Sequence, residues 1–368
     1  MIYLDNASTT ALDPRVLETM MPYFLDCFQN ASSNNKSGKL IKSKIEESRQ
    51  YCADLINAHA DEIIFTSGAT EAINYALKGF LEENFEKGNH IITCKTEHKA
   101  VLKTCEYLET KGVEVTYLNV DKSGALDFKE LERVITPQTS LIAIMLVNNE
   151  TGVIHDLKAI TEIAHSKNVV VFCDATQAIG KISVNVKDLK VDMLCMSGHK
   201  INGPKGIGYL YIKKGISLTP LIHGGSQEND NRGGTYNAPL IIGLGKACEI
   251  LNKSLVTYQQ QYSGLSKYFT DQIEKIEKID IISTNSPKVS NIINLRIKGI
   301  DANVFVESNR EISLSNGSAC TSRIIEGSHV LKAMGLSDAE ANECIRISFD
   351  KNTTKEEVEV LIKQLRSI

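Results

Sequence analysis

Short apolar runs alternate with longer amphipathic segments between about residue 60 and residue 212. The apolar runs have the length of buried strands, and the segments between them repeat apolar residues with the 3.6-residue period of a helix. This pattern predicts strands at residues 62–66, 90–94, 113–119, 140–147, 169–173, 191–196 and 209–212. Repeated alternation of apolar strands and helices is typical of a mostly parallel sheet with helices on both faces. We therefore expect an α/β fold.

Helices are expected where amphipathic segments follow capping residues. Asp13 followed by Pro14 is a favourable helix start, and Ser37 can cap a longer helix. The predicted helices cover residues 15–28, 37–57, 69–82, 98–110 and 157–167, with a shorter one that starts at a capping box at 127–130.

Beyond about residue 239 the pattern changes. A long helical periodicity at 240–276 precedes expected strands at 291–297, 312–314 and 344–349 and a last helix at 354–365. This order predicts a second, smaller α+β domain, and the first dozen residues, which have no partner of their own, are expected to pack on it. The expected division is a large domain at residues 14–250 and a small domain formed by residues 1–13 and 251–368, which carries the loop with Cys320.

The chain has 368 residues, of which 23% are charged, and a net charge of −4. This length is enough to bury a sizeable core, and the charge balance offers no basic field for nucleic acid. No apolar run approaches the ~20 residues of a membrane span, and the N-terminus lacks the basic and apolar regions of an export signal. The composition predicts a cytoplasmic globular enzyme with no direct nucleic-acid or membrane partner.

Nine cysteines are scattered along the chain without a CxxC pair, which argues against a zinc ribbon and against a thioredoxin-like dithiol. Their odd number, in a chain without an export signal, suggests reduced thiols. Most of them lie in apolar runs and are expected to be small core residues. Cys320 differs, because its neighbours at 316–322 are small and polar, as in an exposed loop.

Polar or ionisable residues follow five of the predicted strands, at 67–70, 96–99, 148–151, 174–177 and 197–200. Ligands of parallel sheets bind beyond the carboxyl ends of the strands, so these residues are expected to line one site. Most lysines are solvated surface charges. Lys200 is an unusual one, because it stands at a strand end within the Gly-rich turn 197–208.

The residue types at these strand ends suggest a ligand. Gly68 permits a tight turn, after which Ala69 and Thr70 open a helix whose free N–H groups suit a phosphate. Asp174 would carry a costly buried charge unless it pairs with a cation such as a protonated pyridine nitrogen, although it can also be a simple helix cap. His98 can cap its helix or stack on an aromatic cofactor. With Lys200, this set specifies pyridoxal 5'-phosphate (PLP).

These residues resemble the cysteine desulfurases of the NifS/IscS type, in the class V aminotransferase branch of the fold-type I PLP enzymes. The resemblance rests on TSGATE at 66–71, TEHK at 96–99, VNNE at 147–150, DATQ at 174–177, SGHK at 197–200, HGG at 223–225, RGGT at 232–235 and GSAC at 317–320. It implies a large domain with a mostly parallel seven-stranded sheet flanked by helices, together with a smaller α+β domain.

The resemblance also implies a role for each site residue. Lys200 would hold PLP covalently and serve as the catalytic base, His98 would stack on the ring and assist proton transfers, and Cys320 would be the nucleophile. The other cofactor ligands would be Asp174 at the pyridine nitrogen, Gln177 at the phenolic oxygen, and, around the phosphate, Ala69, Thr70, Ser197, His199 and Thr235 of a second subunit. Asn149, which also contacts the cofactor, and Arg346 would hold the substrate carboxylate.

Three of these roles have support that does not depend on the resemblance. Arg346 alternates with apolar residues at 345 and 347 and so lies on the polar face of its strand, where a solvated arginine is the alternative. Lysine titrates near ~10.4, and burial beside a cationic ring can lower the pKa of such a lysine to roughly 7–8, which suits a base. Cys320 must move between the cofactor and an acceptor, and residues 315–328 lack clear periodicity, as expected of a tether.

The implied reaction converts L-cysteine to L-alanine and leaves the sulfur on Cys320 as a persulfide. The implied partners are a second copy of the chain and a sulfur acceptor, either an iron–sulfur scaffold or a thiolation enzyme. No resident metal is expected, although Cys320 could transiently ligate an iron–sulfur cluster. Housekeeping relatives carry a longer C-terminal segment that helps dock scaffolds, which leaves the acceptor open.

Three other functions are compatible with parts of the sequence. A selenocysteine lyase or an aminotransferase of class V would share the PLP site, but an aminotransferase does not need Cys320. A catalytically idle sulfur-relay scaffold would keep only the fold, and the retention of both Lys200 and Cys320 argues against it. A redox or metal protein is disfavoured by the lack of paired cysteine spacing.

Overall fold

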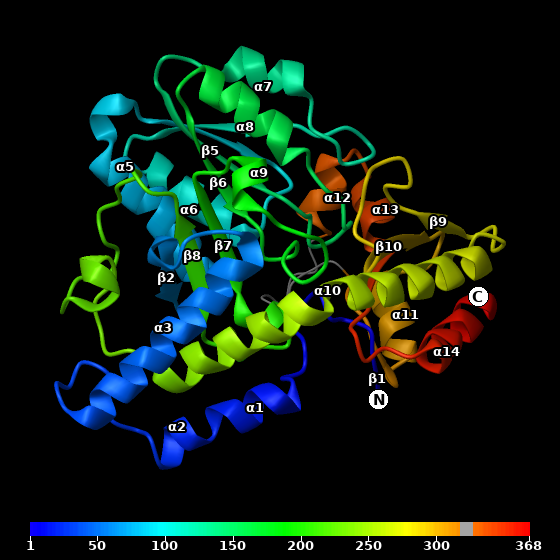
Figure 1. Ribbon diagram of the computed structural model, residues 1–368. Helices are drawn as coiled ribbons and strands as arrows, with labels where there is room; N and C mark the ends of the chain where they lie inside the picture. The colour runs from blue at the N-terminus through cyan, green and yellow to red at the C-terminus, as the bar shows by residue number, and fades with distance from the viewer. Residues whose placement is uncertain (317–326) are drawn as a thin grey trace.

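Seven strands form the central sheet, in the order β2-β8-β7-β6-β5-β3-β4 (Figure 1). Their bounds are β2 Ile63–Thr66, β3 His90–Cys94, β4 Glu114–Leu118, β5 Thr139–Met145, β6 Val170–Asp174, β7 Met193–Ser197 and β8 Gly208–Ile212. Every neighbouring pair is parallel except the two pairs that include β8. The structure, a computed structural model, describes residues 1–316 and 327–368. It confirms the predicted mostly parallel, seven-stranded sheet.

The predicted helices lie close to their expected positions, with two differences, and four short helices, α9, α11, α12 and α13, were not predicted. In chain order the helices are α1 Pro14–Met20, α2 Pro22–Leu25, α3 Lys36–Ile56, α4 Ala69–Asn74, α5 Phe80–Glu83, α6 Lys99–Glu109, α7 Phe128–Val134, α8 Leu157–Ser166, α9 Val186–Leu189, α10 Ala238–Ile273, α11 Ala302–Ser308, α12 His329–Ala333, α13 Asp338–Asn342 and α14 Lys355–Arg366. The single helix predicted at 15–28 is wrong, because Pro22 cannot continue α1 and instead starts α2. A π-helical turn, Tyr75–Gly79, separates α4 from α5 within the helix predicted at 69–82.

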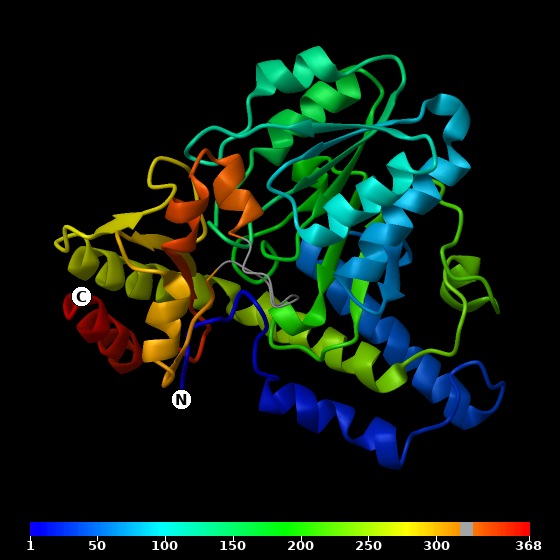
Figure 2. The same ribbon diagram turned by 180° about the vertical axis from the view of Figure 1, so that it is seen from behind.

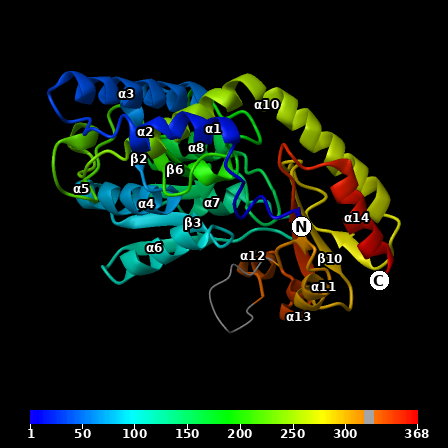
Figure 3. The ribbon, with the colours of Figure 1, turned by 90° about the horizontal axis from the view of Figure 1, so that it is seen from below.

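Helices cover both faces of the large sheet (Figure 3). On one face, strand residues such as Ile64 and Ile91 pack with α4, α5 and α6. Their sequence neighbours Phe65 and Ile92 point to the other face and pack with α3, α8 and the first half of α10. Because successive side chains of a strand point to opposite faces, strands covered on both sides are apolar at nearly every position. This explains the uninterrupted apolar runs of the sequence.

The C-terminal part has a sheet and a core of its own, beside the large sheet (Figures 1 and 2). The antiparallel strands β12 (Cys344–Ser348), β10 (Ile292–Ile297) and β9 (Ile279–Ile281) form this sheet. The strand predicted at 312–314 lies outside it, because β11 (Ile312–Ser313) pairs with β1 (Ile2–Tyr3). Leu4 also belongs to this core, so the first residues of the chain pack on the C-terminal part.

The long helix α10 contacts both cores. Its residues up to Leu251 pack beneath the large sheet, whereas Tyr262, Phe269 and Ile273 pack in the C-terminal core. The boundary predicted near residue 250 falls within this helix, and the division into two domains stays a prediction. Within the described ranges, no helix combines the length and the apolar composition needed to cross a membrane.

A buried ion pair fixes the loop that follows β8. Glu228 lies in the short helix η5 (Gln227–Asp230), and its carboxylate accepts hydrogen bonds from Arg49 at 2.6 and 3.0 Å and from the Phe65 N–H at 3.0 Å. The guanidinium of Arg49 also stacks on the Phe65 ring, 4.6 Å from its centroid. Glu228 has a left-handed backbone with φ of 49°, as do the next two residues, so the ion pair holds an unfavourable turn in place.

The Glu228→Gln variant is expected to lose roughly 3 kcal/mol of unfolding free energy, because it leaves the buried Arg49 charge paired only with Glu46, a carboxylate at the surface. Urea denaturation followed by circular dichroism measures the loss. Glu47→Gln is the matched control, since Glu47 pairs with Lys44 at an exposed site and should cost less than about 1 kcal/mol. Equal losses for the two variants would contradict a structural role of the buried pair.

Candidate active site

The carboxyl ends of the parallel strands meet at one edge of the large sheet. β5, β6 and β7 are neighbours, and η4 (Gly198–Lys200) begins directly after β7. Ser197 at the end of β7 and Thr66 at the end of β2 both lie opposite Gly208 of β8. The turns after β2 and β7 are therefore close in space, although they are distant in sequence.

Lys200 lies at this edge with its side chain largely withdrawn from water. Its ammonium group donates hydrogen bonds to the carbonyls of Ala7 and Ser8, both at 2.6 Å. Burial lowers the pKa of Lys200 to about 7, and the positive charges of Arg346 and Lys181 act in the same direction. A lysine with this pKa is partly neutral near pH 7, as a nucleophile or a base must be.

Asp174 and Gln177 lie on the turn beside Lys200. Asp174 ends β6 and is buried, and one of its oxygens accepts a hydrogen bond from the Thr176 N–H at 2.9 Å. The amide nitrogen of Gln177 donates to the Ala7 carbonyl at 2.7 Å, so Gln177 and Lys200 share one acceptor. The other end of the Gln177 amide, Oε1, is buried and has no hydrogen-bond partner among the described residues.

Groups suited to a phosphate surround the start of α4. Gly68 has a φ of 147°, and a Cβ atom added to it would lie 3.3 Å from the Ser197 hydroxyl oxygen. Ala69 and Thr70 follow as the first residues of α4, and Thr70 is exposed. His199 Nδ1 lies 3.0 Å from the Thr9 hydroxyl, and burial lowers the pKa of this imidazole to about 4. The structure thus brings four of the predicted phosphate ligands to one side of Lys200.

Arg346 approaches the same edge from the C-terminal sheet. Its guanidinium donates to the Asn149 carbonyl at 2.9 Å, to the Asp5 carboxylate at 2.6 Å and to the Ser8 hydroxyl at 2.8 Å. Two buried polar atoms, Arg346 Nε and Asn149 Oδ1, have no partner within residues 1–316 and 327–368. The two residues predicted to bind a substrate carboxylate are therefore in contact.

His98 caps its helix, which is one of the two roles considered for it, and its stacking on a cofactor stays a prediction. It is the N-cap of α6, where Nδ1 accepts a hydrogen bond from the Ala100 N–H at 3.1 Å, which leaves the proton of the neutral ring on Nε2. Desolvation lowers the pKa of His98; Lys200 and His329 lower it further, whereas Asp174 opposes them. The imidazole is accessible to solvent and lies within electrostatic reach of Lys200 and Asp174.

Two predicted residues are not joined to this cluster. Thr235 is exposed on the loop after η5, and Arg232, three residues before it, pairs with Glu71 at 3.0 Å. Cys320 lies outside the described residues, which end at 316 and resume at 327.

The residues that flank Cys320 in sequence are bound at the edge of the site. Before it, the backbone of Ser315 exchanges hydrogen bonds with the backbone of Arg346, at 2.6 and 3.3 Å. After it, the Ser328 hydroxyl donates to the buried Glu150 carboxylate, and His329 Nε2 lies 2.9 Å from the Glu97 carbonyl. Both attachments are therefore close to the residues that surround Lys200.

The residues that contact Lys200 most directly are not recognisable from the sequence pattern. Asp5, Ala7 and Ser8 were expected to belong to the small domain, yet they touch Lys200 and Arg346. A second lysine, Lys181, is buried and donates to the Lys200 carbonyl at 2.6 Å. Its position in an apolar stretch, between Gly180 and Ile182, was the available signal.

The residues present fit PLP. Gln177 Oε1 and Asn149 Oδ1 are buried polar atoms for which the described part of the chain supplies no partner, and each is at a position predicted to contact the cofactor. The absence of a side chain at Gly68 leaves a recess beside Ser197, at the start of a helix, which suits a phosphate. The buried carboxylate of Asp174 is the group that a pyridinium requires.

Comparisons with known proteins agree with this geometry. A cysteine desulfurase IscS from Actinobacillus succinogenes is 42% identical over an alignment of 371 positions, which covers 100% of this chain and 92% of the relative. A cysteine desulfurase IscS from Rickettsia massiliae is 40% identical over 370 residues, covering 100% of this chain and 90% of the relative.

Solved structures show the same likeness. A NifS-like protein has a TM-score of 0.93 and 36% identity, and the match covers 100% of this chain and 98% of that one. The structure of SspA in complex with cysteine has a TM-score of 0.86 and 36% identity, covering 95% of this chain and 99% of that one. The aminotransferase class-V family matches residues 2–361. The chain therefore belongs to the class-V aminotransferase family.

Proposed function

We propose that this chain is a PLP-dependent cysteine desulfurase, which converts L-cysteine to L-alanine and transfers the sulfur to Cys320 as a persulfide. The observation that carries the proposal is the meeting of Lys200 and Arg346 on either side of residues 5–8, with Asp174 and Gln177 beside them. The arrangement places an amine and a carboxylate-binding guanidinium close together, because Lys200 and Arg346 both donate hydrogen bonds to Ser8. The relatives named as cysteine desulfurases support the choice of L-cysteine.

PLP would be held by the residues that the strand-end turns bring together. Lys200 would attach it covalently, Asp174 would hold the proton of the pyridine nitrogen, and Gln177 and Asn149 would contact the ring substituents. The start of α4, Ser197 and His199 would hold the phosphate, joined by Thr235 of a second subunit. Bound PLP supplies an electron sink for the bond that is broken at Cα.

The chain's own residues would then bind the substrate and move its protons. Arg346 and Asn149 hold the carboxylate of L-cysteine and so point its Cα toward Lys200. Lys200 takes the Cα proton as a neutral amine, because its pKa of about 7 lies far below the ordinary value of 10.5. His98, neutral at this pH because its pKa is lowered, is positioned to assist proton transfers at the site.

Cys320 would complete the reaction. Its thiolate attacks the sulfur of the substrate, so that an S–S bond forms while the C–S bond of cysteine breaks, and the carbon takes up a proton to become alanine. The products are L-alanine and the Cys320 persulfide. One L-cysteine and one enzyme thiol supply all of their atoms. The anchoring of Ser315 and Ser328 near Arg346 and Glu150 keeps both ends of the Cys320 segment at the site.

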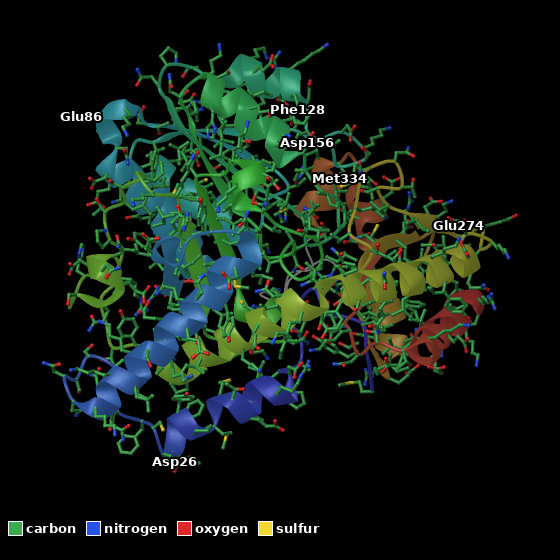
Figure 4. All side chains as sticks on the ribbon, viewed as in Figure 1. Asp26, Glu86, Phe128, Asp156, Glu274 and Met334 are labelled. Carbon is green, nitrogen blue, oxygen red and sulfur yellow. The ribbon has the colours of Figure 1, made fainter. Side chains whose placement is uncertain are left out.

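The proposed protein is a homodimer that delivers sulfur to an acceptor protein, either an iron–sulfur scaffold or a thiolation enzyme. Six exposed apolar side chains between residues 17 and 40 support the dimer: Leu17, Met21, Phe24, Leu25, Phe28 and Leu40. In Figure 4 the labelled Asp26, which lies within this stretch, marks the lower edge of the molecule. A cytoplasmic location suits the eight free cysteines found among the described residues.

The Lys200→Ala variant should lose both the visible absorption of covalently attached PLP and desulfurase activity, with at least a roughly 10³-fold fall in kcat, because the base and the attachment point are one group. Borohydride reduction followed by peptide mass spectrometry should locate PLP on Lys200 of the wild type. Lys205→Ala, an exposed lysine of the same turn, is the control and should keep both properties. Covalent PLP in the Lys200→Ala protein would exclude the proposal.

The Cys320→Ser variant should bind PLP normally and release at least roughly 100-fold less alanine from L-cysteine, because serine cannot accept the sulfur. Intact mass after incubation with L-cysteine should show added sulfur on the wild type and on the control Cys27→Ser, but not on Cys320→Ser. Full alanine production by the Cys320→Ser protein would refute the persulfide step.

Leu25→Glu combined with Phe28→Glu should convert the dimer to monomers in sedimentation velocity, because it places charges in side chains that are 65% and 70% exposed in the single chain. Activity should fall when the dimer is lost, since Thr235 is proposed to act across the interface. Val256→Glu, at a similarly exposed apolar residue on α10, is the control and should stay dimeric. A wild-type monomer with full activity would contradict the dimer.

A further inference from the structure

Lys181 is a buried cation that supports the turn carrying Lys200. It follows Gly180 on the chain that leaves β6, the same segment that holds Asp174 and Gln177, and only 7% of it is exposed. Its ammonium donates a hydrogen bond of 2.6 Å to the Lys200 carbonyl. The backbone carbonyl of Lys181 in turn accepts a hydrogen bond from Gln259 of α10 at 3.1 Å, which holds the Lys181 backbone against α10.

The charge of Lys181 is costly where it lies. Its direct hydrogen-bond acceptor is a neutral carbonyl, and Asp350, the carboxylate that favours its charged form, acts at longer range across a small cavity that both residues line. Burying an ammonium group without a paired carboxylate costs several kcal/mol. A glutamine could donate the same hydrogen bond without this cost. The hydrogen bond alone therefore does not account for a lysine at this position.

Four fixed charges face the Lys200 ammonium, each from a different place in the fold. Arg346 from β12 and Lys181 from the turn after β6 favour the neutral amine, whereas Asp5 from the N-terminal segment and Asp174 from the end of β6 favour the ammonium. Two imidazoles complete the surroundings. His98 at the start of α6 and His199 beside Lys200 both have lowered pKa values and are neutral near pH 7.

We propose that Lys181 is a positioning residue for Lys200, which holds the Lys200 backbone by its hydrogen bond and keeps the Lys200 nitrogen neutral by its charge. The inference rests on the proposed function, in which Lys200 binds PLP and takes a proton. In that state the substrate carboxylate offsets Arg346, and the cofactor's pyridinium offsets Asp174. Neither the substrate nor the cofactor offsets Lys181, so its charge remains, opposed by that of Asp5, to act on Lys200 during the reaction.

The titration order of the two lysines agrees with this role. Burial is the largest cause of both shifts; it lowers the pKa of Lys200 to about 7 and that of Lys181 to about 8. Between these values the neutral form of Lys200 and the charged form of Lys181 both predominate. Asp350 contributes to the difference, because its charge raises the pKa of Lys181.

The test is a pH titration of the visible absorption of PLP in the full-length holoenzyme, which reports protonation of the Lys200 nitrogen. Lys181→Met removes the charge and the hydrogen bond, Lys181→Gln keeps a donor without the charge, and Lys181→Arg keeps both. Loss of one unit charge should raise the midpoint by about one pH unit in the Met and Gln variants, since the cationic form is no longer opposed. The acid limb of kcat/KM for L-cysteine should move in the same direction.

Lys181→Arg should titrate within a few tenths of a pH unit of the wild type. The control Lys205→Met, at an exposed lysine in the turn that carries Lys200, should do the same. Wild-type midpoints in both Lys181→Met and Lys181→Gln would overturn the inference while leaving the proposed function intact. A midpoint shift in Lys181→Met that Lys181→Gln reverses would also overturn it, because the hydrogen bond rather than the charge would then be responsible. Covalent PLP that persists in Lys200→Ala after borohydride reduction would instead remove the proposed function on which the inference rests.

Discussion

The site depends on a short stretch of backbone, residues 5–8, that is hydrogen-bonded from two sides. Lys200, which follows the large sheet, donates to the carbonyls of Ala7 and Ser8, and Arg346, from the C-terminal sheet, donates to the side chains of Asp5 and Ser8. The two sheets have separate apolar cores, and these hydrogen bonds bring the functional residues of the two sheets together. Without the stretch, two largely buried cations would lose their acceptors, which is costly.

The strand-end rule predicted much of the site because it needs only local information. Apolar runs locate strands, parallel order places their carboxyl ends together, and the polar residues that follow must then share one edge. Asp174, Gln177, Ser197 and Lys200 are adjacent in the structure for this reason. The start of α4 joins them because β8 lies between β2 and β7, which the alternation of elements alone does not reveal.

The remaining contacts depend on packing between distant segments. The period of the sequence cannot tell that β1 pairs with β11, and so it could not place Ala7 against Lys200. Lys181 was missed for a related reason, because a lysine in an apolar stretch is usually a chain whose charged end reaches water. Pro22 shows a local rule that was available: a proline inside a helical pattern ends the helix before it.

The two buried lysines make the folded state sensitive to pH in a definite direction. Lys200 and Lys181 titrate near 7 and 8 in the folded chain, whereas their ordinary value is 10.5. Between these limits the unfolded chain binds more protons than the folded one, so the free energy of unfolding rises with pH through this window and falls as pH decreases. The burial that makes Lys200 a usable base therefore destabilises the fold at neutral pH. The apolar cores beneath the two sheets, together with the hydrogen bonds of residues 5–8, have to offset that cost.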